Sequence, residues 1–462
     1  MAADAGHSEA NGLTASLGRF TAALRFDALP DQAIARAKAN MLDAIGCILA
    51  GVNTADATPV RAMAAEDGGA PAALLFGTSL RLPPAAAALA NGAAGHALDY
   101  DDSSPPMIGH PSVPLVSAIF SLGERLGASG ADAITAYVAG LEASARLGRY
   151  MNPSHYAAGW HATATLGTLA ATTGAAKLLG LDAAHIQVAV GIGASSAGGI
   201  RRNFGSAVKP LHAGLAARNG VVAALLARHG LTAAPDALDG ERGFVHVFGG
   251  SERPDLSALR FDDGTVPEIV ASGVGIKRYS CCGCTHSALD ALLALRAAHA
   301  PDPAAVESIH CTMNALVPDI LVHHRPTTPA QAKFSMEYCL AVALIDGDCG
   351  IAQFKPDRVG RDDVQGLLRS VTTSVDAAIP YRNGVYPGTV TIRLADGRTL
   401  VRSAEEAKGH PDFPLTVEEL RAKFMDCATQ TLPAARAAAA FEALATLERA
   451  PRLSDITALL EG

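Results

Sequence analysis

The chain has 462 residues, and at the usual size of about 150 residues per domain we expect two or three structural units. Its formal net charge of -8 disfavours nucleic acid and anionic membranes as partners, because most of the surface would repel phosphate groups. Of the residues, 49% are apolar but only 5% are aromatic, which favours helices packed closely through small side chains.

The first sixteen residues contain neither the basic nor the apolar segment of a secretory signal, and no later window is apolar over about 18 residues. We therefore expect a cytoplasmic protein that does not bind membranes. The eight cysteines are too sparse for a disulfide framework, and six of them lie between Cys281 and Cys349. The sequence predicts reduced thiols.

Helical periodicity dominates the first half of the chain. Apolar residues follow helical spacing from 30 to 52, and again in 84–98, 113–126, 131–147, 162–179 and 207–229, between Gly, Pro or Asp punctuation. This pattern predicts a large all-helical domain that begins with residues 1–265.

The pattern changes after Phe261. The β-prone runs are VESIHCTMN, SVTTSVDA and TVTIRLADGRTLVRS, the last predicting a hairpin around Asp396-Gly397, with helices expected at 285–300 and 330–345. We predict a smaller α/β lid domain at residues 266–402, inserted before a helical return at 403–462. The predicted fold class is mainly α.

The densest polar cluster is GHALDYDDSSPPMIGHPSVP, which includes Asp99, Ser103 and His110. It crosses from a helix end into a Pro- and Gly-containing loop, so its carboxylates and imidazoles can converge on one cavity. An isolated DDSS run is also typical of a helix cap. The neighbouring histidines favour a functional site.

Two further segments carry polar residues at helix starts. In GWHATATLGTL, His161 precedes an apolar helix, where histidines are more often core or capping residues. In IRRNFGSAVKPLHAG, Arg201 and Lys209 precede another helix. Cations in this position either are exposed to solvent in an ordinary loop or bind carboxylates.

The segment GIKRYSCCGCTHSALDA contains Lys277 and His286. Its Cys281, Cys282 and Cys284 are too closely spaced with His286 for a usual structural zinc site, so we predict no metal. A reactive thiol stays open, although buried inert thiols are commoner. The run GIGASSAGG lacks the third glycine and the preceding strand of a dinucleotide fingerprint, and no phosphate loop is present, so we expect no cofactor.

Taken in order, six segments resemble the motif series of the MmgE/PrpD family over nearly the whole chain. They are ANGAAGHALDYDDSS, GHPSVP, GWHATAT, KPLHAGLAARNG, IKRYSCCGCTHSALDA and AKFSMEYCLAVALIDG. The family includes 2-methylcitrate dehydratases, cis-aconitate decarboxylases and an iminodisuccinate epimerase. The resemblance implies a large helical domain with a smaller α/β lid, and enzymes that work without a cofactor.

The resemblance also implies which residues line the cleft: Asp99, Ser103, His110, His161, Lys209, Lys277 and Tyr338. To the substrate-binding candidates Ser103 and Tyr338 we add Arg201 and His286. Removal of a proton beside a carboxylate needs cations to stabilise the developing dianion, a role that suits Lys209 and Lys277. An imidazole can transfer the proton, so we expect His110 and His161 to act as a catalytic pair, with Asp99 orienting an imidazole.

We expect a lyase that dehydrates or decarboxylates a small citrate- or aconitate-like acid. An epimerase of an iminodisuccinate-like amino diacid is the second candidate, and a non-catalytic helical binding protein is the third. Ser103 stands where the family's decarboxylases have threonine, and Val113 follows His110-Pro111-Ser112 where its dehydratases tend to have aspartate. The substrate therefore stays open. A homodimer is expected from the alanine- and leucine-rich helices.

Overall fold

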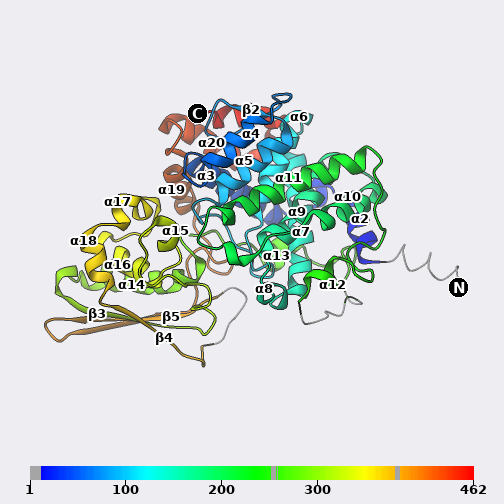
Figure 1. Cartoon of the computed structure of the whole chain (residues 1–462). Coiled ribbons are helices and arrows are strands. Elements are labelled where there is room, and N and C mark those ends of the chain that lie inside the picture. The colour runs from blue at the N-terminus through cyan, green and yellow to red at the C-terminus, as the bar shows by residue number, and fades with distance from the viewer. Residues whose placement is uncertain (1–11, 251–255, 257–258, 380–384) are drawn as a thin grey trace. The chain divides into compact units, whose positions relative to one another are not determined.

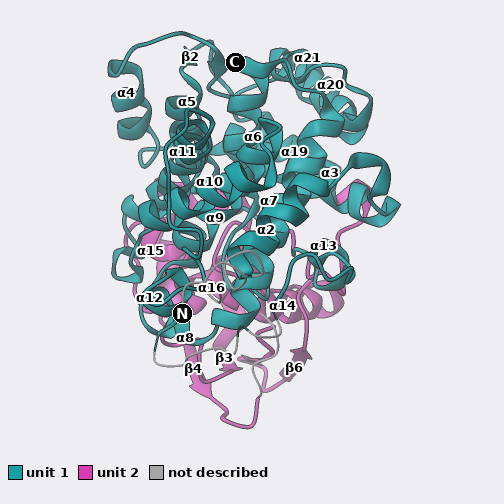
Figure 2. Ribbon diagram, turned by 90° about the vertical axis from the view of Figure 1, so that its right-hand side faces the viewer, with its two compact units in different colours: residues 1–97, 101–274, 420–462 teal, residues 98–100, 275–419 magenta. Residues whose placement is uncertain are grey.

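The computed structural model describes residues 12–250, 256, 259–379 and 385–462, which are mostly helical (Figure 1). The chain divides into two compact units (Figure 2): unit 1 spans residues 1–97, 101–274 and 420–462, and unit 2 spans 98–100 and 275–419. The fold is mainly α with a small sheet-containing part, which confirms the predicted fold class. Among the described residues, no helix is both long and apolar enough to cross a membrane.

Unit 1 is built from helices. Before residue 275 they are α2 (Leu13–Ala23), α3 (Asp31–Gly51), α4 (Thr58–Glu66), α5 (Pro84–His96), α6 (Ser112–Leu126), α7 (Gly130–Met151), α8 (Ser154–Ala157), α9 (Ala162–Leu178), α10 (Ala183–Ser196), α11 (Val208–Arg228), α12 (Phe244–Phe248) and α13 (Glu268–Ala271). The C-terminal helices are α19 (Val417–Ala428), which enters unit 1 at Leu420, α20 (Ala434–Ala445) and α21 (Leu453–Thr457). A two-residue ladder of β1 (Ala73–Leu74) and β2 (Arg81–Leu82) interrupts the helical pattern.

Small residues let the helices of unit 1 approach closely. A Cβ on Gly92 of α5 would lie 2.7 Å from the Gly214 Cα of α11, and a Cβ on Gly214 would lie 2.3 Å from the Leu89 carbonyl oxygen. No other amino acid fits at this crossing without moving a backbone, since real Cβ atoms do not approach so closely. This crossing places the second half of α5 beside the first turns of α11.

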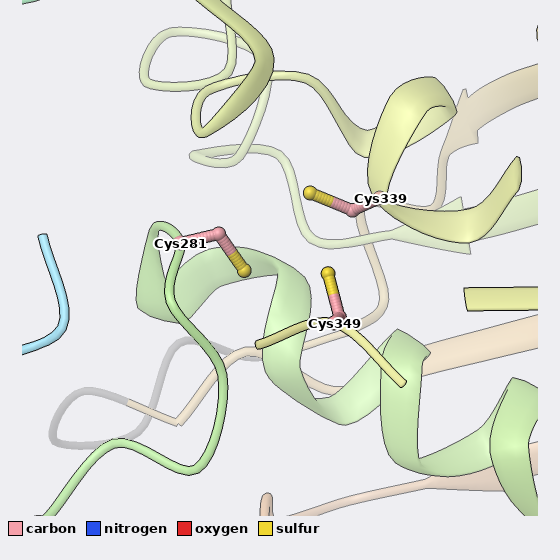
Figure 3. A group of neighbouring side chains, drawn as sticks. All are labelled: Cys281, Cys339 and Cys349. Carbon is pink, nitrogen blue, oxygen red and sulfur yellow. The ribbon is translucent and has the colours of Figure 1, made fainter. Parts of the chain in front are cut away.

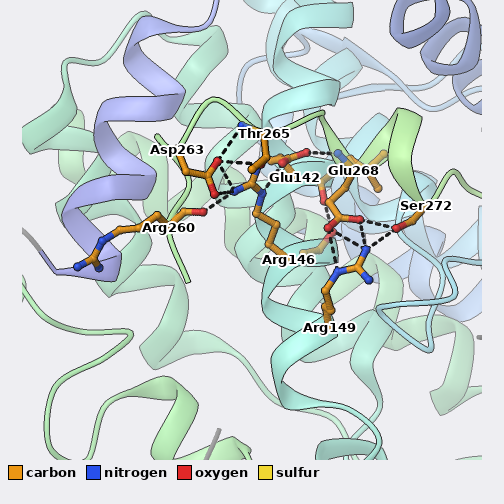
Figure 4. A network of polar contacts seen from close by, with 10 residues as sticks. Glu142, Arg146, Arg149, Arg260, Asp263, Thr265, Glu268 and Ser272 are labelled. Atoms are coloured by element: carbon orange, nitrogen blue, oxygen red, sulfur yellow. Dashed lines mark hydrogen bonds and ion pairs between the residues drawn. The ribbon is translucent and has the colours of Figure 1, made fainter. Parts of the chain in front are cut away.

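An ion-pair network holds the segment before residue 275 against α7 (Figure 4). The Arg146 guanidinium lies 2.5 Å from Glu142 and 3.0 Å from Asp263. The Glu268 backbone N–H donates to the second Glu142 oxygen at 2.7 Å. Burial raises the pKa of Glu142 in spite of the neighbouring Arg146, so these contacts are needed to keep the carboxylate inside.

This network explains why residues 266–274 belong to unit 1. The β-prone pattern placed the second domain at residues 266–402, but residues 266–274 pack with unit 1 through α13 and the network. At the other end, residues 403–419 remain with unit 2, where the Lys408 N–H donates to Asp290 at 2.7 Å. A sequence pattern over a few residues cannot predict partners that lie more than a hundred residues away.

Unit 2 contains a four-stranded sheet in the order β4-β3-β5-β6. The strands are β3 (Val306–Met313), β4 (Val371–Val375), β5 (Gly388–Leu394) and β6 (Thr399–Ala404), and the helices are α14 (His286–His299), α15 (Pro329–Ala332), α16 (Met336–Asp346), α17 (Pro356–Val359) and α18 (Asp362–Leu368). Strands β5 and β6 form the predicted antiparallel hairpin, whereas β4 pairs parallel to β3. The helix expected at 330–345 is divided, because the Ser335 hydroxyl accepts from the Tyr338 N–H at 3.2 Å and caps a new helix.

Candidate active site

Four histidines of unit 1 gather where α5 ends and where α6, α9 and α11 begin. His96 is the last residue of α5, His110 lies just before α6, His161 is the N-cap of α9, and His212 lies near the start of α11. The ring centroids are 4.6 Å apart for His96 and His110, 5.7 Å for His96 and His161, and 5.2 Å for His161 and His212. Residues distant in sequence therefore form one imidazole cluster.

A buried polar chain passes through His96. Its Nδ1 lies 2.9 Å from both carboxylate oxygens of Asp101, and its Nε2 lies 3.1 Å from the Lys209 Nζ. A proton on Nδ1 donates to the carboxylate and leaves Nε2 to accept from the ammonium, so one arrangement satisfies all three groups. Asp101 thereby balances the charge of a lysine that is only 5% exposed.

Hydrogen bonding sets the tautomer of His110. Its Nδ1 lies 2.6 Å from the Asp102 backbone oxygen and 3.8 Å from an Asp101 carboxylate oxygen. Both neighbours accept protons, so Nδ1 is the donor whether the ring is neutral or charged. The His110 ring can therefore gain or lose a proton only at Nε2. The His110 side chain is 15% exposed, in contrast to the fully buried His96 side chain.

The Asp102 side chain is buried on the other side of this loop. Its oxygens accept from the Ser112 N–H at 3.3 Å and contact the Ser112 hydroxyl, which lies 2.6 Å from the Tyr137 hydroxyl. Burial, reinforced by the carboxylates of Asp43 and Asp101, raises the pKa of Asp102 well above its ordinary value. Burial therefore favours the neutral form of the Asp102 side chain, while its backbone oxygen accepts the hydrogen bond from His110.

His161 and His212 form a neutral pair. Their Nδ1 atoms are 3.0 Å apart, so one ring donates and the other accepts. Burial, together with the charge of Lys209, lowers the pKa of His161 well below its ordinary value, and burial lowers the pKa of His212 to about 4. At neutral pH neither ring carries a charge.

An aromatic ring completes the surroundings of Lys209. The Nζ lies 5.4 Å from the centre of the Phe204 ring, and the Arg201 guanidinium carbon lies 5.9 Å from the same centre. Arg201 also stacks on Tyr156 at 3.7 Å and donates to the Tyr156 carbonyl at 2.9 Å. The predicted substrate-binding Arg201 is thus held at the edge of the cluster by cation–π contacts.

The motif HALDYDDSS is shared between the two units. Residues 98–100 belong to unit 2, where the Lys277 Nζ donates to the Asp99 backbone oxygen at 2.6 Å and lies 3.3 Å from its carboxylate. Asp99 has a left-handed backbone, with φ of +53°, which is uncommon for a residue other than glycine. Lys277 and Asp99, both predicted as catalytic, therefore form a buried ion pair in unit 2.

The other predicted substrate-binding residues have separate environments. The Tyr338 hydroxyl donates to the Gln353 carbonyl, and burial raises the pKa of this phenol. His286 is buried in unit 2, with Nε2 3.2 Å from the Cys281 carbonyl oxygen. Ser103 is partly exposed, beside Asp102. Roles for these three in substrate binding stay predictions.

A cavity of about 380 Å³ lies elsewhere in unit 1, beside α10 and α12. Its described lining includes small residues, Phe244, Phe248 and Arg242, and none of the predicted site residues. We place the candidate site at the histidine cluster, because coupled acid–base groups and a buried cation occur there.

Comparison with known proteins finds one family along most of the chain. Residues 15–257 match the MmgE/PrpD N-terminal domain, and residues 279–449 match the MmgE/PrpD C-terminal domain. The chain belongs to the MmgE/PrpD family. This confirms the resemblance seen in the motif series.

Similar members of the MmgE/PrpD family are cis-aconitate decarboxylases. The mouse enzyme is 29% identical over 97% of this chain and 93% of its own length, and the human enzyme is 28% identical over 97% and 95%. The enzyme of Aspergillus terreus is 28% identical over 98% and 96%. These relatives are lyases, so lyase chemistry is supported at the level of the family.

Sequence reasoning left four residues of the cluster out of the predicted site: His96, Asp101, Asp102 and His212. His96 and Asp101 stand in the polar motif, but a helix end and a loop separate them, so their pairing is not visible as a spacing. A signal for His212 was available, because residues three apart share a helix face and Lys209 was already a candidate.

Proposed function

We propose that this MmgE/PrpD protein is a cofactor-free lyase for a small citrate- or aconitate-like acid, with decarboxylation as its favoured reaction. The names of the similar relatives support decarboxylation over dehydration. The observation that carries the proposal is the Asp101–His96–Lys209 chain beside His110. Here the buried Lys209 ammonium lies near the His110 imidazole, which exchanges its proton at Nε2.

In the proposed reaction, a carbon–carbon bond breaks and carbon dioxide leaves. The bonding electron pair stays on the carbon and spreads toward a neighbouring carboxylate, which becomes more negative. Lys209 stabilises this charge, because a buried ammonium interacts more strongly than one in water. The His110 imidazolium then gives its Nε2 proton to the carbon and regains a proton from solvent.

We assign His161 a role in substrate binding rather than in proton transfer. Because its pKa is depressed by burial and by Lys209, the ring is neutral near pH 7 and is a poor source of an imidazolium proton. It instead hydrogen-bonds to the substrate and keeps its orientation through His212. Decarboxylation needs a cation and a proton donor, and Lys209 and His110 supply both. Dehydration would need, in addition, a base that removes the proton beside the carboxylate.

The test is proton NMR in deuterated water with cis-aconitate, citrate, 2-methylcitrate and iminodisuccinate as separate substrates. The proposal predicts loss of carbon dioxide with deuterium at the carbon that receives the proton. Loss of water without carbon dioxide would identify a dehydratase. Deuterium exchange and inversion without loss of either would identify an epimerase instead. Binding of all four acids without any reaction would contradict catalysis.

Variants connect the reaction to the cluster. His110→Ala should abolish most turnover, whereas the matched control His229→Ala should retain it, because His229 is exposed at the far end of α11. Lys277→Met tests separately whether the ion pair of unit 2 contributes to turnover. Wild-type turnover in His110→Ala would remove this imidazole from the mechanism.

A further inference from the structure

Three cysteines of unit 2 converge with their sulfur atoms (Figure 3). The Sγ atoms of Cys281, Cys339 and Cys349 all lie within 4.8 Å of one another, and the three residues are 0% exposed. They come from the loop before α14, from α16, and from the loop after α16. The sequence suggested a different group, in which Cys282 and Cys284 accompany Cys281. In the structure, Cys339 and Cys349 are the cysteines that converge with Cys281.

The protein holds these thiols in place through its backbone. The Ser280 N–H, beside Cys281, donates to the Cys349 carbonyl at 3.1 Å. The Cys281 Sγ lies 3.1 Å from the Thr285 hydroxyl oxygen, and the Cys339 Sγ lies 3.7 Å from the Ala332 carbonyl oxygen. These contacts fix the Cys281 loop and the positions of the Cys281 and Cys339 sulfurs.

Other buried thiols of the described chain lack this arrangement. Cys47 and Cys427 lie on α3 and α19 of unit 1 and interact as a pair. Cys311 lies on β3, and its Sγ is 3.9 Å from the neighbouring Thr312 carbonyl oxygen. Burial alone is usual for cysteine, but three convergent sulfurs form a set of soft ligands.

We propose that Cys281, Cys339 and Cys349 bind one thiophilic d10 cation, either Zn²⁺ or Cu⁺. On binding, each thiol releases its proton to solvent and each sulfur forms one bond to the metal, with no change of oxidation state. Metal–sulfur bonds of about 2.3 Å bring the sulfurs to within about 4 Å of one another, which requires only a small contraction of the cluster.

The two cations differ in what they need beyond the three sulfurs. Structural zinc sites are almost always four-coordinate, whereas soft thiolate sets also suit Cu⁺. His286 is the neighbouring imidazole, because its Nε2 lies 3.2 Å from the Cys281 backbone oxygen. The His286 nitrogens do not lie within 4.8 Å of all three sulfurs, so a Zn²⁺ site would need this ring to turn toward them as a fourth ligand, whereas a Cu⁺ site would not need it.

A bound cation would join the loop that carries Lys277, four residues before Cys281, to α16 and to the loop after it. Metal binding to the folded state alone stabilises that state, so saturation should raise the melting temperature of the protein. The expected rise is several degrees.

The experiment uses the full chain, reduced and freed of metal with a chelator. Titration with Cd²⁺, followed by near-ultraviolet sulfur-to-metal absorption, should reach one ion per chain. Competition with Zn²⁺ and with Cu⁺ identifies the preferred cation. Cys281→Ser, Cys339→Ser and Cys349→Ser should each weaken binding by at least about tenfold, while the controls Cys47→Ser and Cys311→Ser should bind as the wild type does. His286→Ala should weaken Zn²⁺ alone.

A second measurement does not depend on the variants folding. In the wild type, metal should slow alkylation of Cys281, Cys339 and Cys349, measured by peptide mass spectrometry, and should leave the rate at Cys311 unchanged. The proposal is overturned if the wild type shows no sulfur-to-metal absorption or no selective protection. A disulfide between two of the three cysteines in the purified protein would also overturn it.

Discussion

Replacement by asparagine should affect activity very differently at two adjacent buried aspartates, Asp101 and Asp102. Asp101 and Asp102 are both at most 1% exposed, but Asp101 balances Lys209 through His96, whereas the pKa of Asp102 is raised by burial. Asparagine resembles a neutral aspartic acid in shape and hydrogen bonding. Asp102→Asn should therefore be mild, and Asp101→Asn should be damaging.

The magnitudes follow from the bonds that change. Asp102→Asn keeps an acceptor for the Ser112 N–H, and its amide can donate to the Ser112 oxygen once that hydroxyl turns its proton from residue 102 to the Tyr137 hydroxyl, so we expect a loss of less than about 1 kcal/mol in stability and nearly normal kcat. Asp101→Asn removes the charge from a charge-assisted bond, which is worth about 1.5–3 kcal/mol. If this loss falls on the transition state, kcat/KM decreases about ten- to a hundredfold.

The assay is steady-state kinetics on the best substrate from the NMR panel, with urea unfolding of the same variants. Asp102→Ala is the control for the buried site, because it leaves the Ser112 N–H without its acceptor and should cost about 1–3 kcal/mol. If Asp102→Asn proves as damaging as Asp102→Ala, the side chain is an anion in the folded protein. The assignment of a neutral positioning role to Asp102 would then be refuted.

Further expectations concern the proton, the cations, pH and assembly. His110→Ala should reduce kcat by about a hundred- to ten-thousandfold, the usual contribution of a positioned acid or base, with an unchanged circular dichroism spectrum. Lys209→Met should lower kcat and raise KM, because a cation holds carboxylates in both ground and transition states, and unchanged kinetics would remove Lys209 from the site. Between pH 6.5 and about 4 the unfolded chain binds a proton at His212 that the folded chain does not, so the contribution of His212 to the free energy of unfolding should fall as pH falls, by at most about 3 kcal/mol, and be constant above this window. His212→Asn should flatten the dependence measured by urea unfolding. Light scattering should show a homodimer at micromolar concentration, and a monomer alone would contradict that expectation.

Local sequence was enough to predict most helices and the hairpin. Helix α3 begins after Pro30 as expected, and β5 and β6 flank the Asp396-Gly397 turn, because periodicity, proline and glycine act over a few residues. The division of the expected helix at 330–345 depended on one serine cap, a weaker signal. The order β4-β3-β5-β6 was not accessible, because parallel pairing of β3 with β4 joins strands more than fifty residues apart.

The sequence by itself determined the family, the mainly helical class and the candidates His110, His161 and Lys209, because motif residues and helical periodicity are written locally. Only the tertiary structure decided that His96 and Asp101 hold Lys209, since their partner lies more than a hundred residues away. It alone divided the polar motif between the two units at residues 98–100, and it alone brought the thiols of Cys281, Cys339 and Cys349 together. Protonation and metal affinity depend on burial and on neighbours within a few ångströms, and long-range packing sets both.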